Sequence, residues 1–276
     1  MTQITIMGAG GKMGYRLARN LKGSGYAMRY VEVSEAGRAR LAELGLEASP
    51  QDRALGGADV VILAVPDRLI GRVSHEISPK LRAGAMLIAL DPAAPFAGEL
   101  PKRPDLTYFV SHPCHPPIVN DEVDPVAKRD FFGGLAARQN IVCALMQGPE
   151  SDYTLGETIA REMYAPVMRS HRVSVEQMAI LEPALSETVA ATCVTALREA
   201  VDEAVRRGVP REAAFDFLFG HLNVELAIVF GLLPGAVFSD AAQKAIINAR
   251  ARIFQPDWLK VFERDAIEAS IREITR

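Results

Sequence analysis

The first half of the chain alternates short apolar runs with stretches whose apolar residues recur every three or four positions. The run DVVILAV at residues 59–65 is almost uninterrupted, which is typical of a parallel strand covered on both faces. Residues 12–21 instead have the spacing of an amphipathic helix. Further strands are predicted at 4–7, 30–33, 85–90, 106–110 and 141–146. This alternation predicts an α/β domain of Rossmann type, with a doubly wound parallel sheet.

The pattern changes near residues 148–149, after which helical spacing dominates. The sequence SVEQ at residues 174–177 matches a capping box and predicts a long helix that runs to about Arg207. We therefore predict two domains, an α/β domain over residues 1–147 and a mainly α-helical domain over residues 148–276.

A glycine-rich turn joins the first predicted strand to the first predicted helix, in the sequence ITIMGAGGKMGYRLARNL. Glycines let a backbone approach a pyrophosphate, and a helix amino terminus supplies unpaired N–H groups and the positive end of a dipole. The spacing is G-x-x-G-x-x-G, because Met13 stands where the usual dinucleotide fingerprint has its last glycine. The residues expected to contact a dinucleotide in this turn are Gly8, Gly10, Gly11, Lys12 and Met13.

Two carboxylates lie at or just after the ends of the next two predicted strands, at residues 30–33 and 59–65. Glu32 ends the second strand, 18 residues past Gly14. A carboxylate there accepts from both ribose hydroxyls and repels a 2′-phosphate, which favours NAD over NADP, although Arg38 and Arg40 lie nearby. Asp67 follows the strand at residues 59–65, and we expect it to cap the next helix and to contact the cofactor.

The loop SHPCHPPIVNDE at residues 111–122 carries two histidines among three prolines. The preceding strand delivers His112 to the carboxyl edge of the sheet, where open α/β folds bind ligands. The prolines favour polyproline II, which would place His112 and His115 on one side about 9 Å apart. Two ligands of one ion must converge more closely. We therefore expect His112 to bind a metal ion and His115 to face the substrate.

The partner expected for His112 lies on the long helix. Glu182 precedes Pro183, which removes a backbone hydrogen bond inside an apolar stripe. A carboxylate in such a stripe is costly unless it has a partner. His112 and Glu182 are thus the predicted ligands of a divalent ion, zinc by their donor types or else magnesium, with positions left open for a hydroxy acid. The alternative is that His112 binds substrate directly, without a metal.

Several long segments resemble known dehydrogenases. The run KMGYRLARNL is similar to a motif of the β-hydroxyacid and 6-phosphogluconate dehydrogenases. Nearly the whole chain resembles the bacterial D-apionate oxidoisomerases, through GAGGKMGYRLARNL, DPAAPFAGELP, YFVSHPCHPPI, DFFGG, CALMQGPE, APVMRSHRV and EQMAILEPALSETVAA.

The resemblance implies a carboxy-terminal domain of phosphogluconate-dehydrogenase type and a particular reaction. NAD would oxidise the C2 alcohol of D-apionate, a branched sugar acid, and a hydroxymethyl group would then migrate to give 3-oxo-isoapionate. His112, His115 and Glu182 would be the catalytic residues. Two alternatives remain, a β-hydroxyacid dehydrogenase without carbon migration and a non-catalytic NAD-binding sensor.

Composition and charge limit the partners and the cellular compartment that we expect for this protein. A net charge of -3 without a basic stripe argues against nucleic-acid binding, and three cysteines form no disulfide framework. With no secretion signal at Met1, we expect a cytoplasmic protein. The apolar stretch 215–233 contains polar residues, so we predict a buried helix and not a membrane span. This stretch is more apolar than a small helical domain needs for its own core, so we also predict a homodimer. His221, Lys244 and Asn248 are weaker candidates that could enter the site from a partner subunit.

Overall fold

The computed structural model of the chain describes residues 1–274. It contains two compact units. The first comprises residues 1–182 and 268–274, and the second comprises residues 183–267.

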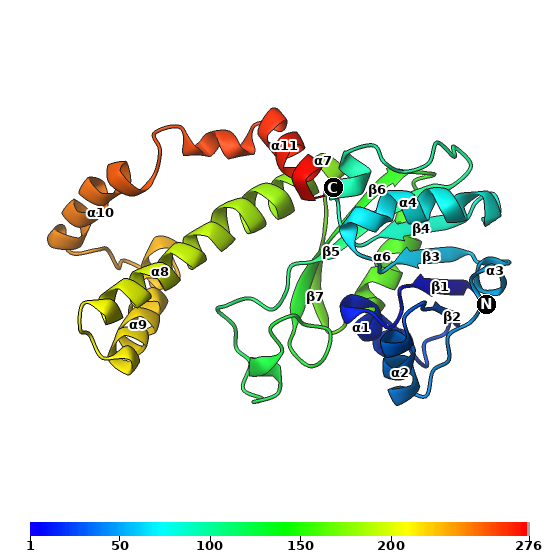
Figure 1. Cartoon of the computed structure of the whole chain (residues 1–276), viewed down its shortest axis with the longest axis horizontal. Coiled ribbons are helices and arrows are strands. Elements are labelled where there is room, and N and C mark those ends of the chain that lie inside the picture. The colour runs from blue at the N-terminus through cyan, green and yellow to red at the C-terminus, as the bar shows by residue number, and fades with distance from the viewer. Residues whose placement is uncertain (275–276) are drawn as a thin grey trace. The chain divides into compact units, whose positions relative to one another are not determined.

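The first unit is built on a seven-stranded sheet with the order β2-β1-β3-β4-β5-β6-β7 (Figure 1). The strands are β1 (Gln3–Met7), β2 (Ala27–Val31), β3 (Val60–Leu63), β4 (Met86–Ala89), β5 (Thr107–Pro113), β6 (Gln139–Gln147) and β7 (Val167–Arg172). Strands β1 to β5 are parallel, which confirms the Rossmann-type sheet. Strand β6 runs antiparallel to β5, because the loop between them makes no helical crossover, and β7 is parallel to β6.

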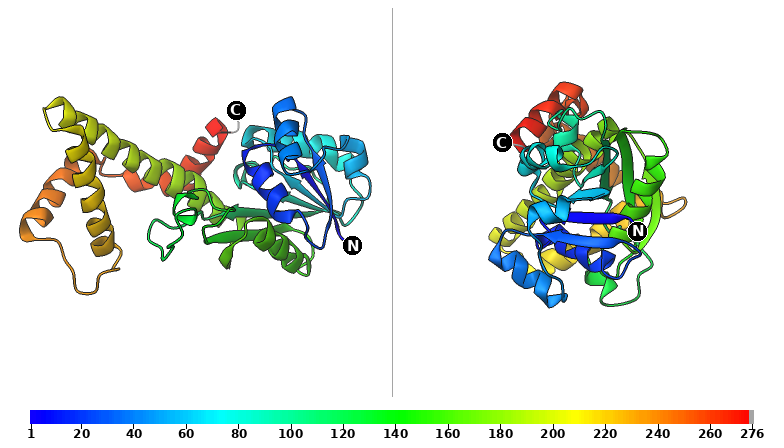
Figure 2. Two further views of the ribbon diagram at one scale, coloured as in Figure 1. Left: turned by 90° about the horizontal axis from the view of Figure 1, so that it is seen from below. Right: turned by 90° about the vertical axis from the view of Figure 1, so that its right-hand side faces the viewer.

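Helices cover both faces of this sheet (Figure 2). They are α1 (Lys12–Leu21), α2 (Glu35–Glu43), α3 (Gln51–Leu55), α4 (Asp67–Ile77), α5 (Ala93–Phe96), α6 (Asp152–Met163) and α7 (Val175–Ala179), with short 3-10 turns at Ser78–Lys80 and Ala127–Arg129. The helix predicted over residues 12–21 is confirmed as α1.

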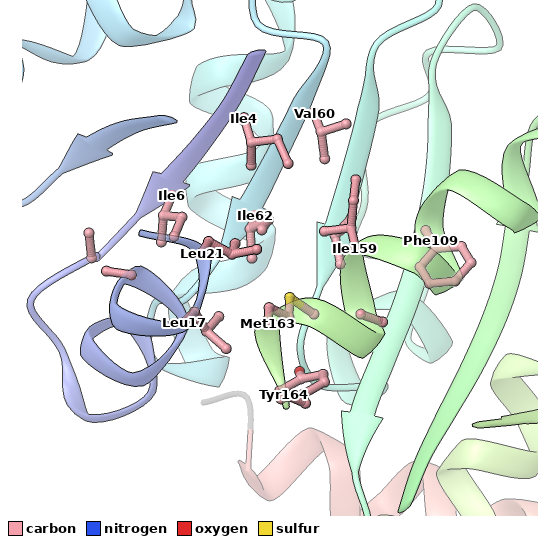
Figure 3. Packing of buried hydrophobic residues seen from close by; sticks show 14 of the residues in the cluster. Ile4, Ile6, Leu17, Leu21, Val60, Ile62, Phe109, Ile159, Met163 and Tyr164 are labelled. Atoms are coloured by element: carbon pink, nitrogen blue, oxygen red, sulfur yellow. The ribbon is translucent and has the colours of Figure 1, made fainter. Parts of the chain in front are cut away.

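The burial of β3 explains its apolar run. Val60 and Ile62 pack on one face with side chains from α1 and α6, such as Leu17 and Ile159 (Figure 3). The alternate residues of β3 pack on the other face with α3 and α4. Since successive side chains of a strand point to opposite faces, a strand between two helical layers must be apolar at every position.

The change of pattern near residue 148 lies inside the first unit. Helix α6 packs against β6, and β7 extends the sheet beyond it. The compact units therefore divide the chain after Glu182, whereas the predicted domain boundary lies after residue 147.

The predicted capping box at Ser174 is present, and a continuous helical run follows it. This run consists of α7, the π-helix η3 (Ile180–Ala191) and α8 (Thr192–Arg206). The disturbance expected at Pro183 thus takes the form of a π-helix, a wider turn in which Thr188 Oγ donates to the Pro183 carbonyl at 2.7 Å. By length and mean hydropathy (1.2), the run Val175–Arg206 is the one helix in the described chain that could span a membrane.

The second unit is helical. It contains most of η3, α8, α9 (Arg211–Val229), α10 (Asp240–Ile253) and a 3-10 turn at Trp258–Phe262, and α11 (Arg264–Ile274) begins at its end. Helices α8 and α9 lie side by side as a hairpin (Figures 1 and 2). Neither α9 nor α10 contains a buried residue, and several of their large apolar side chains, including Phe217, Phe219 and Ile247, are exposed in the single chain.

Candidate active site

The glycine turn lies between the carboxyl ends of β1 and β3, where the strand order of the sheet reverses. Gly8 has a φ of +74°, and a Cβ there would lie 2.5 Å from the Ala64 carbonyl oxygen. The N-cap of α1, Gly11, makes no side-chain cap, and the first turn of α1 contains no acidic residue. The turn therefore presents backbone amides and a positive dipole end to an anion such as a pyrophosphate.

Glu32 is bound to this turn. It is 8% exposed, and its Oε2 accepts from the Gly10 amide at 2.9 Å while Oε1 accepts from the amide and hydroxyl of Ser34, both at 2.8 Å. Burial raises the pKa of Glu32, but these hydrogen bonds outweigh it and hold the pKa below its usual value. A carboxylate offers about four acceptor positions, and these donors, together with the Val33 amide that also lowers the pKa, engage most of them.

The two arginines near Glu32 also contact the backbone around it. Arg40 Nε donates to the Gly10 carbonyl at 2.7 Å, and Arg38 Nε donates to the Glu32 carbonyl at 3.0 Å. Gly10 is therefore held at both its N–H and its C=O, an arrangement that the glycine spacing alone does not reveal.

Asp67 lies at the start of α4, but the expectation that it caps this helix is wrong. Pro66 occupies the N-cap and Asp67 is the first helical residue, so its charge faces the positive dipole end without a capping bond. Although Asp67 lies at the surface, partial desolvation and the charge of Asp91 raise its pKa to about 6, and His112 opposes the shift.

Asp91 is a further carboxylate of this site that was not predicted from the sequence. The feature that could have indicated it is its position just after β4, at the carboxyl end of a sheet strand. Its Oδ1 accepts from the Ala93 amide at 2.7 Å. Burial and the charge of Glu182 raise the pKa of Asp91, whereas the Ala93 amide and His112 lower it. Asp67, Asp91 and His112 thus follow or end the neighbouring strands β3, β4 and β5 at one edge of the sheet.

His112 and Glu182 are brought together. His112 Nε2 lies 3.4 Å from Glu182 Oε2, and the two side chains are 19% and 24% exposed. His112 Nδ1 lies 2.8 Å from the Leu90 carbonyl oxygen, which can only accept, so Nδ1 carries a hydrogen. In a neutral ring Nε2 would then point a lone pair at a carboxylate. The interaction between His112 Nε2 and the Glu182 carboxylate is attractive only when a proton or a cation lies between the two atoms.

His115 does not follow the polyproline expectation. Its φ of +60° bends the loop, and its ring lies 6.1 Å from the ring of His112 in an edge-to-face arrangement. The two histidines are therefore closer than a polyproline turn would place them. Its Nδ1 lies 2.9 Å from the Phe132 carbonyl oxygen. Between the histidines, Cys114 lies at the surface, but partial desolvation and then the nearby Glu182 raise its pKa, which favours the protonated thiol.

The weaker candidates lie elsewhere in the chain. His221, on α9, contacts its own helix: Nδ1 lies 2.8 Å from the Phe217 carbonyl oxygen, and the two rings stack at 3.9 Å. Lys244 and Asn248 belong to α10. Within residues 1–274, no group of three or more His, Cys, Asp or Glu side chains is arranged to hold a metal ion.

Two family models match the chain. Residues 1–91 match the acetohydroxy acid isomeroreductase NADPH-binding domain, and residues 120–275 match the carboxy-terminal domain of decarboxylating phosphogluconate dehydrogenase.

Similar proteins cover the chain from end to end. A D-apionate oxidoisomerase of Rhizobium rhizogenes is 62% identical over 100% of both chains, and one of Cupriavidus necator is 59% identical over 99% of both. A crystal structure from Cupriavidus necator, described as a semialdehyde dehydrogenase NAD-binding protein in complex with calcium and NAD, is 58% identical, with a TM-score of 0.97 and full coverage of both chains.

Proposed function

The chain belongs to the D-apionate oxidoisomerase family, and on that premise we infer that it converts D-apionate to 3-oxo-isoapionate with NAD as the oxidant. The observation that carries this conclusion is the identity of 62% and 59% to two such enzymes over essentially complete chains. The match of residues 1–91 to an acetohydroxy acid isomeroreductase domain supports a ketol-acid type of rearrangement.

The reaction has two balanced steps. In the first, the C2 hydrogen leaves as hydride to NAD and the C2 hydroxyl loses its proton, which leaves a ketone. In the second, the bond from C3 to a hydroxymethyl group breaks and a bond from C2 to that group forms. The C3 hydroxyl proton moves to the C2 oxygen, so C3 becomes the new ketone.

The amino-terminal unit supplies the cofactor contacts. The amides of Lys12 and Met13, at the start of α1, would bind the pyrophosphate, and Gly8, Gly10 and Gly11 let the backbone of the turn approach it. Glu32 would accept from a ribose hydroxyl and repel a 2′-phosphate, which supports NAD over NADP. Asp67, at the end of the neighbouring β3 segment, would contact the nicotinamide half. NAD, when bound, accepts the hydride.

The histidines would hold the substrate and its proton. Because His115 Nδ1 donates to the Phe132 carbonyl, the neutral ring has its lone pair on Nε2. That atom is suited to accept the C2 hydroxyl proton. We assign His115 as the general base of the oxidation.

A divalent cation fits the pair formed by His112 and Glu182. Two ligands that each lie about 2.0–2.2 Å from one ion are separated by roughly the distance seen here, which is 3.4 Å between Nε2 and Oε2. The Leu90 carbonyl, which orients the ring, is a typical outer partner of a metal-bound histidine. The cation, zinc by donor type or else magnesium, would bind adjacent substrate oxygens and polarise a ketone.

We further propose that the protein is a cytoplasmic homodimer that acts on small sugar acids and binds neither nucleic acid nor membrane. The apolar side chains exposed along α9 support a second copy as their cover. Against a membrane, the run Val175–Arg206 carries Glu176, Glu182 and Glu187.

Product identification tests the function. The protein is incubated with NAD and either D-apionate or linear sugar acids, NADH is followed by absorbance, and the product is determined by NMR. We expect NADH and 3-oxo-isoapionate in equal amounts. Release of carbon dioxide would favour a decarboxylating β-hydroxyacid dehydrogenase, to which the phosphogluconate dehydrogenase match also points. Binding of NADH without turnover of any acid would favour a sensor.

A further inference from the structure

The loop between β5 and β6 reaches the start of α1 through a short segment, residues 130–134, which we call the Phe132 turn. The Phe132 ring lies under the Lys12 ammonium, with Nζ 3.6 Å from the ring centroid, and Arg16 Cζ lies 5.3 Å from it. Arg19 donates to the Gly134 carbonyl. Three cations from one helix therefore hold this turn against α1.

The Phe132 turn is also fixed from within. Asp130 is 4% exposed, and its Oδ2 accepts from the amides of Leu135 and Ala136 at 2.9 Å and of Ala137 at 3.2 Å. Gly133 has a φ of +72°, and a Cβ there would lie 2.6 Å from the Gln139 side chain. The turn therefore has one well-defined backbone path.

This path ends at His115, the histidine that we expect to face the substrate. The Phe132 carbonyl oxygen lies 2.9 Å from His115 Nδ1, and the two rings meet edge to face at 5.9 Å. His115 itself has a φ of +60°, a conformation that non-glycine residues adopt only when their surroundings enforce it. The carbonyl selects the tautomer with the hydrogen on Nδ1, and the ring edge restrains the imidazole plane.

We propose that Phe132 is a positioning residue, which ties His115 to the cofactor-binding end of α1 through its carbonyl on one side and its ring on the other. Lys12 is the first residue of α1, so the same side chain that packs on Phe132 belongs to the turn expected to bind pyrophosphate. The inference rests on the proposed function, because it takes His115 as the base for the C2 hydroxyl. Neither the glycine pattern nor the histidine loop indicates Phe132 by itself.

Substitutions of two neighbouring phenylalanines test the idea. Phe132→Leu keeps apolar volume but removes the ring face, and we expect kcat with D-apionate to fall about tenfold or more, since small misplacements of catalytic groups have effects of this size. Phe132→Tyr keeps the ring and should stay within about threefold of the wild type. Phe131→Ala is the matched control, because that side chain is 76% exposed, and it should change kcat less than about twofold.

A double-mutant cycle then separates positioning from a general loss of structure. If Phe132 acts through His115, Phe132→Leu has no further effect on kcat in a His115→Asn background. Multiplied effects in the double mutant overturn the proposal, as does an equal loss in Phe131→Ala.

A measurement without turnover tests the same contact. In wild-type protein labelled with ¹⁵N-histidine, the His115 ring should show the Nδ1–H tautomer by NMR. Phe132→Leu keeps the backbone carbonyl but loses the ring that packs on Lys12 and Arg16, so the carbonyl should be held less firmly and His115 should shift toward a tautomer mixture. An Nε2–H tautomer in the wild type contradicts the inference even if D-apionate is turned over. Conversely, absence of turnover with the expected tautomer refutes the proposed function and leaves the positioning intact.

Discussion

The chemistry of the site depends on which ring nitrogen of His112 faces the Glu182 carboxylate. His112 presents Nε2 to Glu182 because Leu90 accepts from the opposite nitrogen. Two acceptors facing each other at 3.4 Å require a proton or a cation between them. The pair is therefore the residue-scale feature on which the metal proposal depends.

Glu182→Gln tests this pair. The substitution keeps the shape but removes the charge, and we expect kcat/KM for D-apionate to fall at least about 100-fold because the cation loses an anionic ligand. Bound divalent metal, measured by mass spectrometry, should fall in parallel. Glu43→Gln, at an exposed position on α2, is the control. Activity that survives rigorous chelation would contradict the metal assignment and leave the dehydrogenase assignment standing.

Asp67 gives a prediction about pH. Its pKa in the folded protein is raised to about 6 from an ordinary value of 3.8. The folded state therefore binds the proton more tightly than the unfolded state, and the stabilisation from this group is complete below about pH 4 and lost as the pH rises through about 6. The difference in melting temperature, wild type minus Asp67→Asn, should thus decrease between pH 4 and pH 7.

Differential scanning fluorimetry over that range measures the effect. Asp121→Asn, at an exposed loop position, provides the reference curve. A difference that stays constant with pH would show that Asp67 does not titrate in this interval.

At the scale of elements, Glu182 lies in the first turn of the π-helix η3. Pro183 lies inside this helix and has no amide hydrogen to donate, and the wider turn accommodates it. Such wider turns are often found at functional sites.

Pro183→Ala should separate stability from activity. Removal of a proline from a helix interior relieves a cost of about 3 kcal/mol in a regular helix. We expect a higher melting temperature, together with a lower kcat/KM as the segment relaxes toward an α-helix and moves the Glu182 carboxylate. Thr188→Val, which removes only the bond to the Pro183 carbonyl, should not raise the melting temperature. An unchanged kcat/KM in Pro183→Ala would show that Glu182 does not depend on η3.

For the whole molecule, the second unit lacks a core of its own. Helix α9 has no buried residue. Large side chains on it or at its end, such as Phe217 (69% exposed), Phe219 and Phe230, are exposed to solvent in the single chain. A soluble monomer rarely exposes this much contiguous apolar surface. We expect a second copy to cover it.

Phe217→Glu tests the assembly. Sedimentation velocity should show a dimer for the wild type, and a charge in the covered face should shift it toward monomer, since an unpaired buried charge is strongly unfavourable. Glu212→Gln, on the same helix, should leave the distribution unchanged. A wild-type monomer at micromolar concentration would refute the dimer.

Much of the first unit could be predicted from short stretches of sequence. The bounds of α1, the capping box at Ser174 and the parallel strands follow from periods and caps that operate over a few residues. The proximity of His112 and Glu182 was also predictable, because His112 ends a strand at the ligand-binding edge of the sheet and Glu182 lies in an apolar helical stripe where a carboxylate needs a partner.

The strand and helix alternation, the candidate dinucleotide turn and the pair of candidate ligands can therefore be inferred from the amino-acid sequence. The contact of Glu32 with Gly10, the cluster that joins Asp91 to Asp67, and the contact of Phe132 with His115 became visible only in the folded chain. The same holds for the antiparallel direction of β6 and the π-helical form of η3. Periodicity and capping act between residues that are near neighbours in the chain, so they can be recognised in the sequence. The contacts named above join residues from separate elements, and whether these approach each other depends on the packing of the whole sheet.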